Sequence, residues 1–107
     1  MNIPKKERKK KEEEEEIKVE DYNKYYHQAV KYSFSKNYDK TIENWMKVLT
    51  INPKYVNGWV ILGKTYEKMG DYQEALKYYD KALEITPTHL KANQYKTHLL
   101  KEKEKVS

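Results

Sequence analysis

Apolar residues recur along the chain at intervals of three and four, and this spacing predicts five α-helices. In the first, which we expect to begin near Val19 or Asp21 and to end near Ser35, Tyr25, Ala29 and Tyr32 form one stripe. The inward-facing residues predicted for the next three helices are Ile42, Trp45, Met46, Val48 and Leu49, then Trp59, Leu62 and Tyr66, then Tyr72, Ala75, Leu76, Tyr79, Ala82 and Leu83. A fifth helix is predicted from about Thr88 to Lys103.

Residues typical of helix ends separate these segments. Asn37 is a good N-cap for the second helix, and Gly70 suits the end of the third. Asn52-Pro53 and Thr86-Pro87 each place a capping residue before a proline, which predicts that a new helix starts there. In the fifth helix the expected apolar positions hold Asn93, Lys96 and Thr97, and only Leu100 remains. We therefore expect a capping helix with a polar outer face.

The predicted helices form two stretches with the same layout, Tyr22–Tyr55 and Val56–His89, thirty-four residues apart. A period of this length, with helical spacing inside each unit, indicates a helix–turn–helix repeat. Such arrays offer extended binding surfaces. The identical pairs are Asn23/Asn57, Tyr32/Tyr66, Tyr38/Tyr72, Lys47/Lys81, Leu49/Leu83, Ile51/Ile85 and Pro53/Pro87.

Both stretches resemble the tetratricopeptide repeat (TPR) motif, W-x2-L-G-x2-Y followed by A-x3-F, A and P. The second carries Trp59, Leu62, Gly63, Tyr66, Ala75, Tyr79, Ala82 and Pro87, with Gly70-Asp71-Tyr72 at the turn. The first carries Tyr25, Gln28, Ala29, Tyr32, Thr41, Trp45, Val48 and Pro53, with Lys36-Asn37-Tyr38 at the turn. The resemblance implies an all-α, right-handed α-solenoid. Its domain would cover residues 19–104, with repeats at 22–55 and 56–89 and a C-terminal capping helix at 88–104.

The resemblance also implies a peptide-binding groove, because the first helix of each repeat lines a concave face in TPR proteins. The groove positions are Asn23, Tyr26, His27, Val30 and Phe34, then Asn57, Val60, Ile61, Lys64 and Lys68, then Lys91, Gln94, Tyr95, His98 and Lys101. One end of this set is aromatic and aliphatic and the other is rich in lysine. We therefore expect the partner to be a short, partly acidic segment of another protein with an apolar anchor. The contacts expected first are Tyr26, Lys64, Lys91 and Tyr95.

One TPR subclass grips the C-terminal carboxylate of heat-shock chaperones with Lys, Asn, Asn, Lys and Arg. The corresponding positions here are Tyr26, Val30, Ile61, Lys91 and Tyr95. Only Lys91 matches, so we expect no carboxylate clamp of that kind.

Several of these residues also have an ordinary structural interpretation. The residues expected in the core are Tyr25, Tyr32, Trp45, Trp59, Tyr66 and Tyr79. Val60 and Ile61 face away from the stripe formed by Trp59, Leu62 and Tyr66, which fits either groove exposure or packing on a neighbouring helix. The lysines equally fit a solvated helix face.

The composition excludes several kinds of chemistry. The 107 residues include no cysteine, so disulfides and thiolate catalysis are excluded. His27, His89 and His98 lack the spacing of a helical metal site, and Ser33 and Ser35 lack an evident base. No glycine-rich phosphate loop is present. We therefore expect an adaptor or scaffold that is not an enzyme and needs no cofactor or metal.

Residues 1–18 form a charged, low-complexity tail that we expect to be disordered. Its basic run, Lys5–Lys11, is interrupted only by Glu7 and is followed by Glu12–Glu16. A nuclear-import signal and a nucleic-acid arm are alternative interpretations, both opposed by the adjacent glutamates. The net charge of +5 lies entirely in residues 21–107, because residues 1–20 carry seven basic and seven acidic side chains.

We expect a cytoplasmic protein that does not bind membranes. The N-terminus carries no apolar leader, and the longest apolar run, Trp59–Leu62, is too short to cross a bilayer. Two other functions stay open. An unfinished stack could assemble with copies of itself. The lysine-rich C-terminal helix could bind nucleic acid weakly, although the single arginine counts against this.

Overall fold

The computed structural model describes residues 17–106, which form helices and the turns between them after a short lead-in, Ile17 and Lys18. A short 3-10 helix, η1 (Val19–Asp21), precedes five α-helices: α2 (Tyr22–Phe34), α3 (Tyr38–Ile51), α4 (Val56–Lys68), α5 (Tyr72–Ile85) and α6 (Leu90–Val106). The predicted all-α fold is confirmed. Most of the predicted charged tail, residues 1–16, lies outside the described residues.

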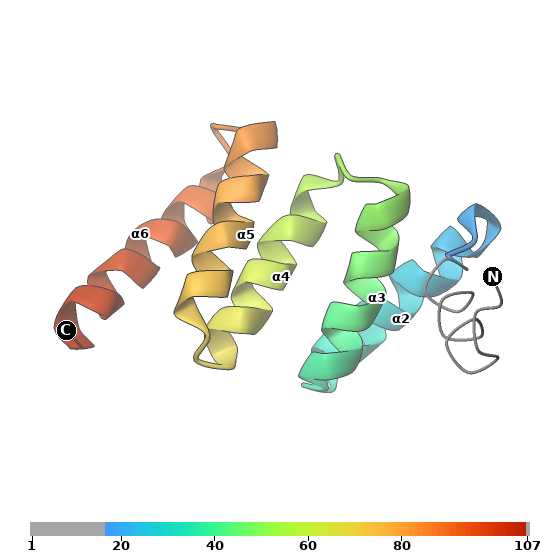
Figure 1. The fold of residues 1–107 in the computed structure, drawn as a ribbon, viewed down its shortest axis with the longest axis horizontal. Helices are drawn as coiled ribbons and strands as arrows, with labels where there is room; N and C mark the ends of the chain where they lie inside the picture. The colour runs from blue at the N-terminus through green and yellow to red at the C-terminus, as the bar shows by residue number, and fades with distance from the viewer. Residues whose placement is uncertain (1–16, 107) are drawn as a thin grey trace, which may run out of the picture.

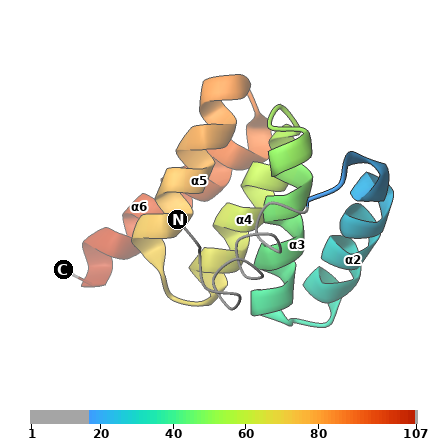
Figure 2. The same ribbon diagram turned by 45° about the vertical axis from the view of Figure 1, so that its right-hand side comes forward.

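The helices stand side by side in chain order, as Figure 1 shows. Helices α2 and α3 form one antiparallel pair, and α4 and α5 form the next. The two pairs meet where α3 packs on α4, and α6 packs on α5 and α4. In Figure 1, α3 and α5 lie toward the viewer, and the turned view of Figure 2 separates them from α2, α4 and α6. The stack therefore has two layers, each built from alternate helices.

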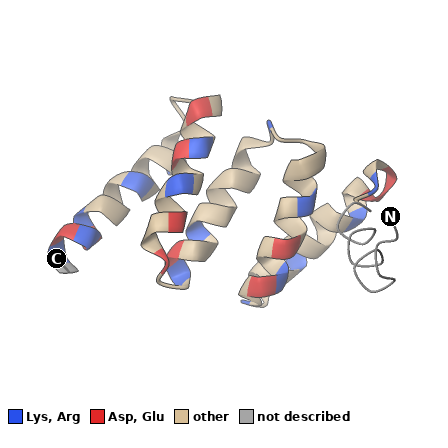
Figure 3. Cartoon of the chain, in the orientation of Figure 1, with Lys and Arg blue, Asp and Glu red and all other residues tan. Residues whose placement is uncertain are grey.

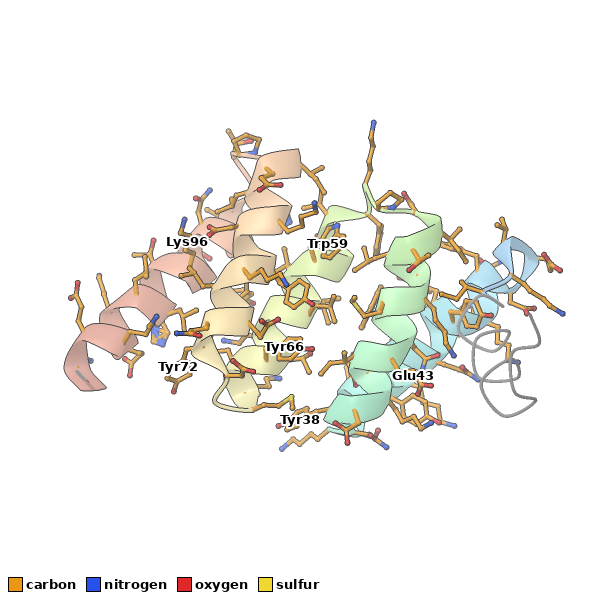
Figure 4. The ribbon with its side chains drawn as sticks, in the orientation of Figure 1. Tyr38, Glu43, Trp59, Tyr66, Tyr72 and Lys96 are labelled. Carbon is orange, nitrogen blue, oxygen red and sulfur yellow. The ribbon has the colours of Figure 1, made fainter. Side chains whose placement is uncertain are left out.

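The core runs along the contacts between these layers. Its largest cluster joins α2, α3 and α4 with Tyr78 of α5, and its fully buried members include Ala29, Trp45 and Leu62. Smaller clusters join α4 to α5 and α6 and α5 to α6. Figure 4 labels Trp59 and Tyr66 in the space between α3 and α5, where both rings stack on Tyr78.

Gly63 lets the two helices of the second pair, α4 and α5, approach closely. A Cβ atom at Gly63 would lie 2.5 Å from the ring carbons of Tyr79 and 3.1 Å from the backbone oxygen of Ala75. Any side chain here would therefore push α4 and α5 apart.

The two turns inside the repeats have matching geometry. Gly70 adopts a left-handed conformation (φ 84°) that ends α4, and Lys36 does so in the first repeat (φ 60°). Asn37 then accepts a hydrogen bond from the Lys40 amide, and Asp71 accepts one from the Glu74 amide. The predicted roles of Gly70 as a helix stop and Asn37 as an N-cap are confirmed.

The prediction that Asn52-Pro53 and Thr86-Pro87 start helices was wrong. Asn52 is the C-cap of α3 and Thr86 is the C-cap of α5. Each proline lies in the turn that follows, and α4 and α6 begin only at Val56 and Leu90. Proline cannot continue the preceding helix because it lacks an N–H, so the same pair of residues serves to end a helix.

The inward face of α6 also differs from the prediction. Leu100 is 40% exposed, whereas Leu99 is 1% exposed and Ala92 is fully buried. Ala92 packs against Val60 and Ala82, and Leu99 packs against Ala75 and Tyr79. Helix α6 therefore buries the face that meets the second repeat.

Candidate binding groove

A hollow of about 410 Å³ extends across α2, α4 and α6, where the repeat resemblance implied a concave groove. Its wall also includes residues of α3 and of the turns that precede α4 and α6. The lining residues are Tyr26, Val30, Ser33, Tyr38, Trp45, Tyr55, Asn57, Val60, Ile61, Lys64, Thr65, Lys68, His89, Lys91 and Tyr95. This size is within the range of pockets that hold small ligands or a few side chains of a peptide.

One wall of the hollow is a cluster of aromatic rings. Trp45 and Tyr55 stack with their centroids 5.9 Å apart. Tyr26 meets both rings edge-on, at 5.6 Å from Trp45 and 6.0 Å from Tyr55. Burial, together with a hydrogen bond that the Tyr55 hydroxyl donates to Tyr26, raises the pKa of Tyr55 to about 12. The cluster is therefore a rigid, uncharged surface that suits an apolar side chain.

The opposite wall carries a lysine that its neighbours hold in place. The Lys64 ammonium lies 4.6 Å from the centre of the Tyr95 ring and 3.3 Å from a carboxylate oxygen of Glu67. The Tyr79 hydroxyl donates to the other oxygen of Glu67 at 2.8 Å. Burial and this bond raise the pKa of Tyr79 above its usual range. The network fixes the position of Lys64, and Glu67 offsets part of its charge.

Two more lysines at the rim carry charge that no acidic group offsets. Lys68 and Lys91 are exposed, and neither forms an ion pair with another residue between 17 and 106. No aspartate or glutamate is among the lining residues. The hollow therefore combines an aromatic wall with a positive electrostatic potential.

His89 links α4 to α6 at the end of the hollow where α6 begins. His89 Nδ1 accepts the Ala92 amide at 3.2 Å, so His89 acts as the N-cap of α6. Because Nδ1 is the acceptor, Nε2 carries the proton and donates to Asn57 Oδ1 at 3.0 Å. This pair fixes the start of α6 against the start of α4.

The structure gathers most of the predicted groove residues around the hollow. Those that line it are Tyr26, Val30, Asn57, Val60, Ile61, Lys64, Lys68, Lys91 and Tyr95. Val60 is only 5% exposed and packs between α4 and α6, so of the two interpretations left open, packing describes it better. Ile61 is half-buried against the main core. The remaining predicted positions are exposed and do not line the hollow: Asn23, His27, Phe34, Gln94, His98 and Lys101.

Sequence reasoning missed the part of the wall that comes from other elements. These residues are Ser33, Tyr38, Trp45, Tyr55, Thr65 and His89. The sequence places Trp45 only in the core. In the structure it is a core residue with 1% of its surface exposed, and it also contributes to the wall of the hollow. Tyr55 lies in the turn before α4, where the helical periodicity gives no signal. Its position just before the repeat boundary was the only available clue.

A second hollow of about 380 Å³ lies on the other layer, between α3 and α5. It is lined by Met46, Trp59, Lys77, Tyr78, Lys81 and Glu84. Lys77 and Lys81 each have a glutamate partner, Glu74 and Glu84 respectively, at 3.9 Å. Figure 3 shows basic and acidic residues interspersed on α5. The charge of this hollow is therefore balanced, unlike that of the first.

Residues 17–106 contain no group of three histidine, aspartate or glutamate side chains that could hold a metal ion. Among the helices described, none combines the length and apolar character that crossing a membrane requires.

The fold and the groove define a class of protein, the helical repeat proteins whose stacked helix pairs form a concave face. Residues 56–89 match the tetratricopeptide repeat family, which is the predicted second repeat. The second helix pair of the chain is therefore a TPR.

The chain spans less than half the length of the curated relatives described here. The chain is 34% identical over 56 residues to superkiller protein 3 of Saccharomyces cerevisiae, covering 52% of this chain and 4% of that protein. Superkiller protein 3 of Schizosaccharomyces pombe is 38% identical over 53 residues, with coverage of 50% and 4%. The uncharacterized protein ycf37 of Pyropia yezoensis is 35% identical over 78 residues, with coverage of 73% and 40%.

A solved structure has the same fold. The crystal structure of MamA superimposes with a TM-score of 0.61 over 78% of this chain and 59% of that one. At 20% identity, this match supports the stacked-helix architecture alone.

Proposed function

We propose that this chain is a protein-binding module that holds a short, partly acidic segment of another protein in the hollow lined by α2, α4 and α6. TPR domains generally bind other proteins. The acidic character and the apolar anchor of the segment are inferred from the lining of the hollow, which has an aromatic wall, three lysines and no acidic residue.

The two walls have different roles in this proposal. Tyr26 and Tyr55, held in place by the buried Trp45, receive the apolar anchor, because rigid aromatic surfaces supply most of the affinity at interfaces. Lys68 and Lys91 attract and orient the acidic residues, because unpaired rim charges mainly set association rate and register. A binding role of this kind requires neither a cofactor nor catalysis.

The first test is affinity capture from a lysate with wild type and with the double variant Lys68→Glu, Lys91→Glu. Both side chains are exposed, so the exchange leaves the core intact. The matched control is Lys77→Glu, Lys81→Glu, which makes the same change in charge beside the second hollow. Circular dichroism confirms that all three proteins are folded.

We expect a protein captured by wild type and by the control to be lost with the Lys68/Lys91 variant. With the purified partner, its affinity should fall roughly tenfold or more, because two attractive charges become repulsive. Equal loss in the control would move the site to the second hollow. Capture that disappears after nuclease treatment would favour nucleic acid, and capture of this chain alone would favour self-assembly.

A further inference from the structure

An acidic segment of the same chain directly precedes the helical stack that forms the lysine-lined hollow. Glu12–Glu16 is a run of five glutamates that ends one residue before Ile17. The described chain begins at Ile17, which packs on the main core cluster. The Lys18 amide then donates to the hydroxyl of Tyr25 at 3.5 Å. These contacts fix the point at which the acidic run joins the helical stack.

That point lies at the α2 end of the stack, and α2 carries part of the wall of the hollow. Helix η1 and the start of α2 stand at the same edge of the molecule in Figures 1 and 2. Tyr26, in the second turn of α2, lines the hollow. The start of α6, with Lys91, lies next to the start of α4 because His89 contacts Asn57. Neighbouring helices lie about 8–10 Å apart, so α6 is about two such spacings from α2. Five extended residues reach about 16 Å, so the far end of the run, with its glutamate side chains extended, comes within reach of Lys91 at the start of α6.

The charges of the two parts are opposite. Lys68 and Lys91 have no acidic partner among the described residues, and the lining of the hollow contains no carboxylate. The glutamate run carries the largest block of negative charge in the sequence. A tethered segment also has an effective concentration in the millimolar range, so even weak ion pairs give substantial occupancy. The basic run Lys5–Lys11 is farther from the tether and would be repelled by the same lysines.

We propose that Glu12–Glu16 contacts Lys91 at the rim of the hollow and competes there with the acidic segment of a partner. The inference rests on the proposed function, since it names an internal competitor for that same site. A partner must then displace the run, which lowers its apparent affinity by the fraction of molecules in which the rim is occupied.

Paramagnetic relaxation tests the contact without any partner. The chain has no cysteine, so Lys11→Cys gives a single attachment point for a spin label next to the run. We expect broadening of the amide signals of Asn57, Lys64 and Lys91, and little effect at Lys77 and Lys81. Replacing all five residues of Glu12–Glu16 with glutamine should remove this broadening. Broadening confined to η1 and α2, or unchanged by the glutamines, would overturn the proposal.

A mixing experiment separates this contact from one between two copies. Spin-labelled protein without an isotope label is mixed with isotope-labelled protein that carries no spin label. We expect no broadening in the mixture. Broadening there would mean that the run occupies the hollow of a second copy, which contradicts an internal competitor.

A binding experiment tests the competition itself. The probe is a fluorescein-labelled peptide, Asp-Asp-Trp-Asp-Asp, titrated into wild type and into the variant with five glutamines. We expect roughly three- to tenfold tighter binding to the variant, the size of effect that a few exposed ion pairs produce. The matched control replaces Lys9, Lys10 and Lys11 with glutamine and should not tighten binding.

The two proposals fail in different ways. Equal peptide affinity for wild type and the glutamine variant would reject the competition and leave the binding function standing. If lysine reversal at Lys68 and Lys91 does not weaken partner binding, the function fails, while the relaxation experiment still decides whether the run contacts the rim.

Discussion

At Gly63, the hydrogen that stands in place of a side chain faces the ring of Tyr79. A methyl group would lie 2.5 Å from two ring carbons and 3.1 Å from the Ala75 carbonyl oxygen. Tyr79 is fully buried and its hydroxyl is held by Glu67, so the ring has nowhere to move. We expect Gly63→Ala to lower the free energy of unfolding by about 1–3 kcal/mol, the usual cost of overpacking. Urea denaturation measures this.

Gly58→Ala is the matched control for this prediction. Its added methyl would lie 2.9 Å from the end of the flexible Leu49 side chain and 3.2 Å from a ring carbon of Tyr55, and no backbone atom is among these nearest neighbours. Alanine also favours a helix over glycine by about 1 kcal/mol. We therefore expect little net change at Gly58. Equal losses at the two glycines would show that the close contact with Tyr79 does not limit the approach of α4 and α5.

Single residues show what local chemistry reveals and what it leaves open. Gly70 and Asn37 were assigned correctly because a left-handed stop and a side-chain cap each need a particular residue type. Asn52-Pro53 was assigned to the wrong helix because the pair fits both the end of one helix and the start of the next. The Pro53 carbonyl accepts a hydrogen bond from the Trp59 indole N–H at 2.7 Å. No sequence pattern predicts this contact between the turn and α4.

Among the elements, α6 buries a different face from α4, the equivalent helix of the second repeat. In the second repeat, α4 uses Trp59, Leu62 and Tyr66 against its own second helix, α5. The equivalent positions of α6 are Asn93, Lys96 and Leu100, and no second helix covers them within residues 17–106. The face toward the preceding repeat holds Ala92, Tyr95 and Leu99 and stays packed. Comparing α6 with a full repeat therefore pointed to the wrong leucine.

This difference predicts unequal effects of truncating neighbouring leucines. Leu99 is 1% exposed and packs against Ala75 and Tyr79. We expect Leu99→Ala to destabilise the protein by about 2–5 kcal/mol, because it removes buried methyl groups and leaves a cavity. Leu100→Ala, at a position that is 40% exposed, should change stability by less than about 1 kcal/mol. Thermal and urea unfolding of the two variants measure the difference. A larger loss at Leu100 would contradict the register of α6 described above.

Across the whole molecule, the fold was more predictable than the groove. The repeat period and helical stripes specify the helices and their pairing, because each unit buries the same face. The groove depends on which side chains from different elements converge. Trp45 from α3 and Tyr55 from a turn enter its wall, while His98 and Lys101 on α6 lie beyond it. Such convergence follows from the curvature of the stack, which one repeat's sequence does not encode.

The tyrosine content of the stack predicts how its stability depends on alkaline pH. Burial raises the pKa of Tyr55, Tyr66, Tyr78 and Tyr79, and that of Tyr55 reaches about 12. In the unfolded chain a tyrosine has a pKa of about 10. Above that pH the unfolded state loses protons that the folded state keeps, so unfolding becomes more favourable as pH rises. The stabilising contribution of the protonated phenols is thus complete below about pH 10 and is lost as pH rises through the folded pKa values.

We expect the free energy of unfolding to be nearly level from neutral pH to about pH 9 and to fall between about pH 10 and pH 12. Urea denaturation at a series of pH values measures the fall, and tyrosinate absorbance should lag behind that of a denatured sample. Tyr55→Phe removes one of the shifted phenols from the edge of the groove, so its stability should decline less steeply over the same range. A stability that stays level to pH 12, or a decline as steep in Tyr55→Phe as in wild type, would mean that burial in the aromatic wall does not keep Tyr55 protonated. In that case the aromatic wall would not stay uncharged at alkaline pH, and it would no longer suit an apolar anchor there.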